Sequence, residues 1–513
     1  MHNFFECSSH KTLCKVRDCL IVIVAIAVMV YLLVKEYLRP GLVLFSVVVV
    51  LLGTGVISVS DALAGFSNRG MITVALLFLV SEGIRASECL KPIMRGLFPS
   101  RSDSISRSYA AILPAVAAIS AFVNNTPIVV IFIPHIKAWC RQVGVSVKKL
   151  LIPLSYAAIL GGMCTLIGTS TNLVVHGLMI DAGLSGFSMF ELGKVGAIIA
   201  LAGTIYMVLF INRLLPDDAP TPKSSNRHIV EVILASRFPG IQCTTEQFDF
   251  YKHYGAHIIS AWRDGEVVDD MESYCYKEND KLLLSAERHF VDTWGSSSIF
   301  LIMTNGTEHS HTVARWRQLL SLLLLVAMVI GASIGRGGGT DMLFWAAVVA
   351  VIMAFTGIFP AKRYTKFISW DILVTIASAF AISRAMILSG LADAIAAGVI
   401  TLCNTLSPRF VLALIYIITN IITEIITNNA AAAFSFPIAL SAATQLGVSP
   451  TPLLVAIAIA ASASFCSPIG YQTNTIVQGL GGYRFRDFVR AGLPLSVIAF
   501  TVSMIFIPIF WEF

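Results

Sequence analysis

Residues 120–134 read SAFVNNTPIVVIFIP, and residues 423–437 read TEIITNNAAAAFSFP. Both stretches place a hydroxyl residue five positions before a central asparagine and a proline nine positions after it, at an offset of 303 residues. Each stretch interrupts a longer apolar segment, 106–141 in one case and 408–446 in the other. We predict that each segment forms two short helices that meet at a polar tip.

The same spacing extends outward from these tips. Gly168-x-x-Thr171-Asn172 returns 302 residues later as Gly470-x-x-Thr473-Asn474, and Thr54-Gly55 returns as Thr356-Gly357. One such match in an apolar chain is expected by chance, but a run of matches at nearly constant spacing indicates an internal repeat.

Composition limits the class of protein. Of the 513 residues, 56% are hydrophobic and 13% are charged, and the mean hydropathy is +0.79. Soluble globular proteins carry about 25% charged residues, so a water-soluble or disordered chain is excluded. The ten cysteines form no CxxC pair, which argues against a zinc or iron–sulfur site. No nucleophile–base triad or phosphate loop is present, so we expect neither an enzyme nor a cofactor.

Apolar stretches of about 20 residues, long enough to cross a bilayer, recur along the chain. We place them at roughly 20–37, 42–60, 71–90, 150–180, 190–213, 316–335, 342–359, 370–390, 452–480 and 488–510. Each half then has five crossings and one re-entrant hairpin, and an odd count requires the second half to be inverted. The predicted fold is an all-α polytopic membrane protein of two inverted repeats with a small α+β cytoplasmic insert.

The predicted domains are an N-terminal tail (1–19), repeat 1 (20–215), a linker and insert (216–315, core about 227–304) and repeat 2 (316–513). In the insert, period-two patterns and an Asp264-Gly265 turn predict five strands. These are His228–Leu234, Ala256–Trp262, Glu266–Val268, Lys281–Ser285 and Ser298–Met303, with helices over Thr244–Tyr254 and near 287–293.

Charge predicts the orientation. Residues 216–315 carry a net charge of −6 and the remainder carries +12. With the N-terminus outside, 17 basic residues fall in cytoplasmic loops and 7 in external segments. Because Lys and Arg favour the cytoplasmic side, we expect a multi-pass protein of the plasma or inner membrane, with a cytoplasmic insert and both termini external.

Four polar clusters interrupt the apolar helices, at 120–127, 161–172, 423–429 and 467–474. Broken helix at membrane depth must line a protein cavity, because lipid cannot satisfy free backbone groups. Helix N-termini there can bind an anion, while carbonyls and hydroxyls can hold Na⁺. Helix packing is the simpler explanation of one such cluster. Four clusters placed symmetrically favour a binding site.

At these residues the chain resembles the divalent anion/sodium symporter (DASS) family of the ion-transporter superfamily. The tip motif of that family is Ser-Asn-Thr after an earlier Ser or Thr. Here it reads Asn124-Asn125-Thr126 after Ser120, and Thr427-Asn428-Asn429 after Thr423. The altered outer positions disfavour a carboxylate site, because carboxylate carriers keep Ser-Asn-Thr closely.

The broken segments Gly168-Thr-Ser-Thr-Asn172 and Pro468-Ile-Gly-Tyr-Gln-Thr-Asn474 look like the sodium/sulfate subgroup of that family. This resemblance implies an elevator-type carrier that works as a homodimer. The insert resembles the TrkA-C (RCK_C) module of potassium-transport proteins, at Tyr254-Gly-Ala-His257, Arg263-Asp-Gly-Glu266 and Asn279-Asp280-Lys281. It implies a small-molecule regulator, and an inert spacer is the equally weighted alternative.

The hypothesis is sodium-coupled import of a small divalent oxyanion, with sulfate as the most favoured substrate. The predicted substrate ligands are Asn124, Asn125, Thr126, Thr171, Asn172, Thr427, Asn428, Asn429, Thr473 and Asn474. The predicted sodium ligands are Ser120, Asn124, Asn125 and Gly168 in one half, and Thr423, Thr427, Asn428 and Gly470 in the other. None of the four clusters contains Lys or Arg, so a bound cation must supply the positive charge.

Three alternatives remain open within transporters: a di- or tricarboxylate symporter, a sodium/proton antiporter and a metalloid-efflux permease of the same superfamily. An antiporter needs a carboxylate in its site, and Glu424 is the candidate. Its simpler role is to bond nearby backbone. A regulated channel is disfavoured because no potassium-filter sequence is present.

Overall fold

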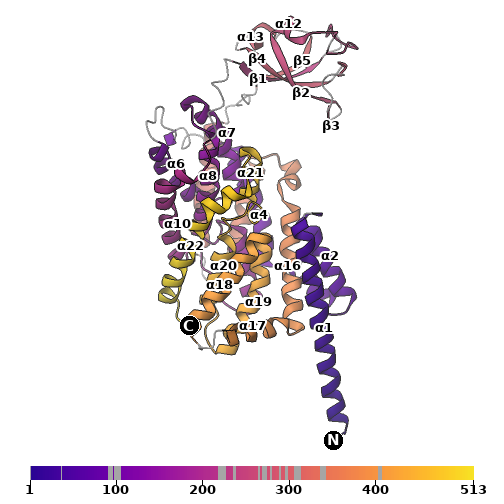
Figure 1. Ribbon diagram of the computed structural model, residues 1–513, viewed down its shortest axis with the longest axis vertical. Helices are drawn as coiled ribbons and strands as arrows, with labels where there is room; N and C mark the ends of the chain where they lie inside the picture. The colour runs from indigo at the N-terminus through magenta and orange to yellow at the C-terminus, as the bar shows by residue number, and fades with distance from the viewer. Residues whose placement is uncertain are drawn as a thin grey trace. The chain divides into compact units, whose positions relative to one another are not determined.

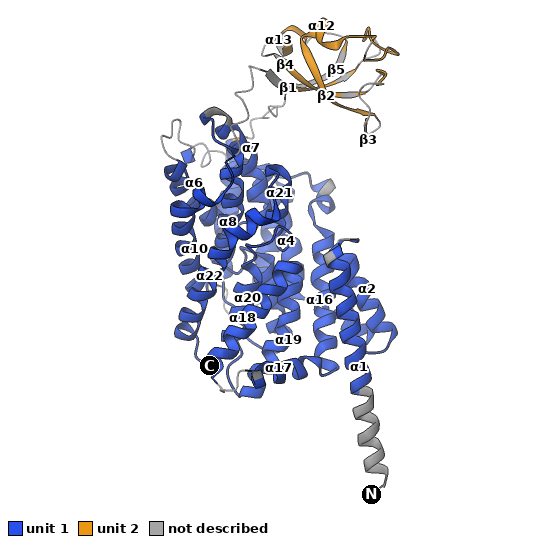
Figure 2. Cartoon of the chain, viewed as in Figure 1, with its two compact units in different colours: residues 1–218, 315–513 blue, residues 219–314 orange. Residues whose placement is uncertain are grey.

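The computed structural model divides the chain into two compact units, residues 1–218 with 315–513 and residues 219–314 (Figure 2). The structure describes residues 2–35, 37–90, 96–97, 105–217, 227–234, 238–245, 247–263, 266–268, 274–277, 280–287, 290–294, 299–305, 314–334, 342–402 and 407–513. The predicted Asp264-Gly265 turn and Asn279 lie outside these residues.

The first unit is helical (Figure 1). Its first half contains α1 (His2–Lys35), α2 (Pro40–Gly53), α3 (Val59–Ala64), η1 (Gly65–Ser67), α4 (Arg69–Ala86), α6 (Ile105–Ser120), α7 (Asn125–Val143), η2 (Val147–Lys149), α8 (Leu151–Gly162), α9 (Ser170–Asp181), α10 (Gly193–Tyr206), η3 (Met207–Ile211) and α11 (Asn212–Leu214). Its second half contains α14 (Arg315–Ile334), α15 (Met342–Phe355), η4 (Ala361–Phe367), α16 (Trp370–Leu388), α17 (Leu391–Leu402), α18 (Pro408–Ile425), α19 (Asn428–Leu446), α20 (Thr451–Ser462), α21 (Gln472–Gly481) and α22 (Phe485–Phe510).

Equivalent helices of the two halves match in their bounds. α2 and α15 begin and end 302 residues apart, and α7 and α19 begin and end 303 residues apart. The local chemistry repeats as well. α7 ends at Gly144 with φ 78° and α19 ends at Gly447 with φ 67°, left-handed conformations that glycine adopts without a steric penalty. The repeat read from the sequence is therefore present in the helices themselves.

Contacts between the halves are reciprocal. α2 packs on α16, and their repeat equivalents α15 and α4 pack on each other. Asp61 lies 3.3 Å from Arg384, while Gly65 approaches the Ala377 carbonyl, so the chain leading into α4 runs against the direction of α16. Because α4 and α16 are equivalent helices, the two halves are inverted relative to one another.

The helix breaks fall at the four polar clusters. α6 stops at Ser120 before α7, α18 stops at Ile425 before α19, and the spans expected at 150–180 and 452–480 each divide into two helices. Among the described residues, seven helices are long and apolar enough to cross a membrane. They are Lys15–Leu33, Val59–Ala86, Gly193–Leu214, Arg315–Ile334, Trp370–Leu388, Pro408–Ile425 and Phe485–Phe510.

The polar N-terminal residues belong to the same helix as the first span, α1, in which the candidate span is Lys15–Leu33. One helix differs from the sequence-based expectations. α17 was not expected, because its 12 residues are fewer than the about 20 that cross a bilayer. It packs on α19, which buries its apolar residues in place of a sequence-local partner.

The second unit contains an antiparallel five-stranded sheet in the order β3-β2-β4-β1-β5. Its elements are β1 (Arg227–Leu234), α12 (Phe250–Tyr254), β2 (Ala256–Arg263), β3 (Glu266–Val267), β4 (Lys281–Glu287), α13 (Phe290–Trp294) and β5 (Phe300–Asn305). All five predicted strands are present. The helix expected over Thr244–Tyr254 is confined to α12, because Gln242 and Thr245 donate backbone hydrogen bonds to the carbonyls of Tyr276 and Tyr274.

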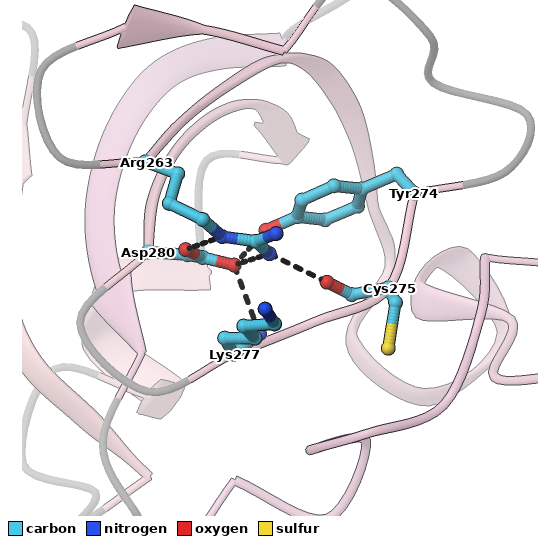
Figure 3. A network of polar contacts seen from close by, with 5 residues as sticks. All are labelled: Arg263, Tyr274, Cys275, Lys277 and Asp280. Atoms are coloured by element: carbon cyan, nitrogen blue, oxygen red, sulfur yellow. Dashed lines mark hydrogen bonds and ion pairs between the residues drawn. The ribbon is translucent and has the colours of Figure 1, made fainter.

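A buried carboxylate joins β2 to the segment before β4 (Figure 3). Asp280 accepts hydrogen bonds from the Arg263 guanidinium at 2.7 and 2.9 Å, the Tyr274 hydroxyl at 2.6 Å and the Lys277 N–H at 2.8 Å. Burial is the largest single influence and raises the pKa of Asp280, but these bonds and the charge of Arg263 together lower it below 3.8. Burial and Asp280 raise the pKa of Tyr274. These bonds to Asp280 thus hold β2 and the segment before β4 together inside the second unit.

Candidate functional site

A polar cavity of about 220 Å³ lies inside the first unit, between the two halves. Its lining comes from both polar tips, both broken segments and the starts of α2 and α16. The lining residues are Pro40, Asn124, Thr126, Thr169, Ser170, Asp371, Ile372, Thr375, Thr427, Asn428, Asn429, Ile469, Gly470, Tyr471, Gln472 and Thr475.

Four helices begin at this cavity. α7 starts at Asn125, α9 at Ser170, α19 at Asn428 and α21 at Gln472, and each of these residues lines the cavity or adjoins one that does. The first turn of a helix carries free N–H groups and the positive end of the helix dipole. Four such ends directed at one polar space make that space favourable to negative charge.

The polar tips and the broken segments contact each other across the repeat. Ser170 donates to the Asn429 side-chain oxygen at 3.0 Å, and Thr126 donates to that of Gln472 at 3.3 Å. Asn429 is the repeat equivalent of Thr126, and Gln472 is that of Ser170. These two contacts are therefore the same interaction made twice, which places the cavity on the pseudo-two-fold axis.

The central asparagine of the first tip is buried. In the best-satisfied orientation, the two N–H groups of the Asn125 amide have three acceptors within reach, Ser120 Oγ at 2.6 Å, Ala158 O at 3.0 Å and Gly168 O at 3.2 Å, and its oxygen accepts from the Tyr471 hydroxyl at 2.5 Å. The predicted sodium ligands Ser120, Asn125 and Gly168 are thus in direct contact. Asn125 lies behind the cavity wall, whereas Asn124 lines the cavity.

In the second tip, Thr427, Asn428 and Gly470 line the cavity together. The Asn428 N–H donates to the Gly470 carbonyl at 3.3 Å, and the buried Thr427 Oγ1 has no hydrogen-bond partner. Thr423 lies deeper and donates to the Ala461 carbonyl at 2.6 Å. The predicted residues of this half thus lie close to one another.

The side chains of Asn172 and Asn474 each hydrogen-bond to carbonyls of their own broken segment. Asn172 Nδ2 donates to the carbonyls of Gly162 (3.2 Å) and Thr165 (2.8 Å). Asn474 Nδ2 makes the equivalent bonds to Ser464 (2.9 Å) and Ser467 (3.0 Å). Both side chains are at most 1% exposed, so the structure places them outside the cavity lining.

The neighbouring threonines take part in the same framework. Thr473 Oγ1 accepts from Ser155 at 2.8 Å, and Thr171 donates to Asn429 at 3.3 Å. Of the residues predicted from the sequence, six line the cavity: Asn124, Thr126, Thr427, Asn428, Asn429 and Gly470. The other predicted residues form the layer that holds these six.

Glu424 bonds the backbone of the opposite segment. Its carboxylate accepts from the N–H groups of Phe465 (3.0 Å) and Cys466 (2.9 Å) and from the Ser464 hydroxyl (3.2 Å). It does not line the cavity. The geometry matches the simpler of its two predicted roles. Among the described residues no group of three or more His, Cys, Asp or Glu could hold a metal ion.

Sequence reasoning missed Asp371, the one charged side chain among the described residues that line the cavity. It lies on the second residue of α16, and its Oδ1 accepts from the Gly41 N–H at 3.2 Å. An acidic residue inside an apolar span was the available signal. Thr169, Ser170, Tyr471 and Gln472 were inside the quoted clusters but were not selected.

The fold and the cavity define a polytopic α-helical membrane transporter, because inverted repeats with broken helices around a central polar site are the architecture of secondary carriers. The chain belongs to the citrate transporter (CitMHS) family, whose sequence model matches residues 23–432 and 337–512. It is a transporter rather than an enzyme.

Similar proteins cover nearly the whole chain. An uncharacterized transporter of Synechocystis sp. is 29% identical over 92% of this chain and 94% of its own length. A putative sulfur deprivation response regulator of Chlamydomonas reinhardtii is 27% identical over 94% of this chain and 100% of its own. Sodium/sulfate cotransporter 2 of Chlamydomonas reinhardtii is 23% identical over 86% and 84%.

Proposed function

We propose that this protein is a sodium-coupled importer of a small divalent oxyanion, with sulfate as the first candidate. The observation that carries the proposal is the convergence of four helix N-termini on one cavity lined by neutral hydroxyl and amide groups. Such groups donate to the oxygens of a tetrahedral anion without requiring a basic side chain.

Electrostatics supports the coupling to a cation. The described lining contains no Lys or Arg and one carboxylate, Asp371. A dianion entering this cavity alone would be repelled by Asp371 and would lose its hydration with only dipoles in return. Sodium bound first at the two tips, near Ser120 and Asn125 and near Thr427 and Asn428, would offset that negative charge.

The relatives support the same substrate class, because a relative matched over 84% of its own length is named a sodium/sulfate cotransporter. The family description names citrate, which makes a di- or tricarboxylate the second candidate. The altered Ser-Asn-Thr motifs favour the smaller anion. The metalloid-efflux permease is less well supported, because no metal-ligand cluster is present in the described residues. Glu424 is committed to backbone, so a proton antiporter would have to use Asp371, the carboxylate that lines the cavity.

The proposed mechanism is elevator-type alternating access within a homodimer, with the insert in the cytoplasm and both termini outside. The inverted halves support an exchange between two opposite-facing states. We propose a TrkA-C-like regulatory role for the insert, on the resemblance of its sequence and its separate core. If an added nucleotide or cation changes uptake by the full-length protein, and deletion of residues 219–314 abolishes that change, the insert is a regulator.

The function is tested with the full-length protein in proteoliposomes. Radiolabelled sulfate should accumulate under an inward sodium gradient and should not accumulate when potassium replaces sodium. In parallel assays, unlabelled sulfate, thiosulfate, succinate and citrate are each added in excess, and the decrease in uptake of the labelled sulfate is measured. Equal uptake in both salts would refute sodium coupling, and competition by citrate without competition by thiosulfate would favour the carboxylate candidate.

The matched variants are Asn429→Ala, in the cavity, and Thr501→Ala, whose hydroxyl bonds only its own helix on an exposed face. Asn429→Ala should reduce uptake by about tenfold or more, because it removes a cavity ligand and the partner of Ser170. Thr501→Ala should transport as the wild type does.

A further inference from the structure

Two oppositely charged residues, Asp371 and Arg69, occupy equivalent positions in the internal repeat. Asp371 stands in the cavity wall on the first turn of α16. The residue 302 positions earlier, at the equivalent place on α4, is Arg69. Thr375 Oγ1 donates to the Asp371 carbonyl at 2.7 Å, and Thr73 Oγ1 donates to the Arg69 carbonyl at 2.7 Å. The two helix starts share this bond, while the side-chain charges are reversed.

The two helix starts have different surroundings. The start of α4 is packed on α9: Asn68 Nδ2 donates to the Gly177 carbonyl at 3.3 Å and to Asp181 Oδ2 at 2.8 Å. A Cβ atom at Gly70 would meet the Leu173 carbonyl at 2.5 Å. This side is closed.

The equivalent side is open. The start of α16 faces α21 across the cavity, with Ile372 on one wall and Thr475 on the other. The repeat equivalents of these two residues are Gly70 and Leu173, which are in contact on the closed side. The structure therefore holds one open and one closed copy of the same helix pair.

A carrier built from inverted repeats exchanges the two arrangements during its cycle. When the α16 side closes and the α4 side opens, the new opening lies at the start of α4. Arg69 then occupies the position in that opening that Asp371 occupies in the present one. An anion then meets a carboxylate on one side of the membrane and a guanidinium on the other.

We propose that Asp371 and Arg69 give the site a lower affinity for its anion on the α16 side than on the α4 side. In the proposed topology the α16 side is cytoplasmic, so the anion is captured outside next to a positive charge and released inside next to a negative one. This inference rests on the proposed anion transport, and it adds the residues that make the two faces unequal.

Transport from each face tests the proposal. The full-length protein is expressed in bacteria, and sulfate uptake is measured in right-side-out and in inside-out membrane vesicles. Asp371→Asn should lower the KM for sulfate by about threefold or more in inside-out vesicles and leave it unchanged in right-side-out vesicles. Arg69→Gln should raise the KM by a similar factor in right-side-out vesicles only. Asp393→Asn, an exposed acid on α17, is the matched control. Equal shifts in both vesicle types, or none, would overturn the proposal.

A second measurement does not depend on the substrate. Thr475→Cys, in a chain without its native cysteines, places a thiol in the cavity for positively and negatively charged methanethiosulfonate reagents. The ratio of the cationic to the anionic reaction rate should fall by about threefold or more when Asp371→Asn is added. An unchanged ratio would refute the role of Asp371. If wild-type vesicles take up no sulfate while the ratio of the two reaction rates falls as expected, the proposed substrate is wrong and the role of Asp371 in the cavity stands.

Discussion

Thr169 and Tyr471 occupy the same position in the two halves of this chain, and their hydroxyl oxygens lie 2.7 Å apart. An equivalent pair in contact marks the pseudo-two-fold axis of the repeat. The longer tyrosine also reaches Asn125 in the first polar tip, at 2.5 Å. One hydroxyl therefore connects both broken segments and a tip at the cavity.

Removing that hydroxyl should loosen the centre of the molecule. Tyr471→Phe leaves the buried Asn125 and Thr169 each without one partner, which should cost about 1–3 kcal/mol of stability. Thermal unfolding in detergent measures the loss, and sodium-dependent uptake should fall with it. Tyr364→Phe, half exposed on η4, is the control. Unchanged stability would mean that this hydroxyl has no structural role.

Asn172 and Asn474 should behave as structural clamps. Asn474→Ala frees two buried carbonyls in the segment before α21, and Asn172→Ala does the same before α9, so each should cost about 1–3 kcal/mol. Unfolding temperature measures this effect, with Thr501→Ala on an exposed helix face as the control. A higher KM for sulfate with no change in stability would instead support the sequence-based assignment of these residues as substrate ligands.

Glu424 distinguishes a proton carrier from a backbone anchor. Glutamine in its place can still accept from the N–H groups of Phe465 and Cys466, so Glu424→Gln should keep transport within about threefold of the wild type. Glu424→Ala leaves both N–H groups unpaired and should lower transport and stability together. Uptake of sulfate measures both variants. Complete loss of transport in a stably folded Glu424→Gln protein would support the antiporter alternative.

Gly470 should tolerate no side chain. A Cβ atom there would overlap the Thr423 carbonyl and the Ser464 hydroxyl, because the second broken segment lies directly against the second tip. Gly470→Ala should therefore abolish uptake or strongly destabilise the protein. Gly479→Ala, on α21 with nothing within 4 Å of its Cβ position, is the matched control and should be neutral or slightly stabilising. Equal behaviour of the two variants would contradict this packing.

The insert should be acid-sensitive through Asp280. Because its pKa is lowered in the folded state, the ionised carboxylate contributes stability above the unfolded pKa of about 3.9, and this contribution is lost as the pH falls through the lower folded pKa. Urea unfolding of residues 219–314, followed by Trp262 and Trp294 fluorescence, measures it. Asp280→Asn should be less stable at neutral pH and should lose part of the acid dependence. Lys252→Ala, on an exposed site, should unfold as the wild type does at every pH.

Much of the fold followed from the sequence, because the signals were local. The offset of Asn125 and Asn428 predicted two matching helix pairs, since the polar residues at each tip cannot continue an apolar helix in lipid. Alternating apolar residues likewise predicted the insert strands. α17 was missed, because an apolar segment of 12 residues is shorter than the about 20 residues that mark a membrane span.

The sequence by itself determined the membrane class, the inverted repeat and the four polar breaks, because hydropathy and spacing are properties of the chain before it folds. Only the tertiary structure decided which polar residues face the cavity. Asn428 and Asn474 look alike as sequence, yet one lines the cavity and the other is bonded to carbonyls of its own segment. The same holds for Asp371, which gains its importance from a wall built by helices more than 300 residues apart. Which hydrogen bonds an amide makes depends on what packs around it, and that is fixed only when the two halves come together.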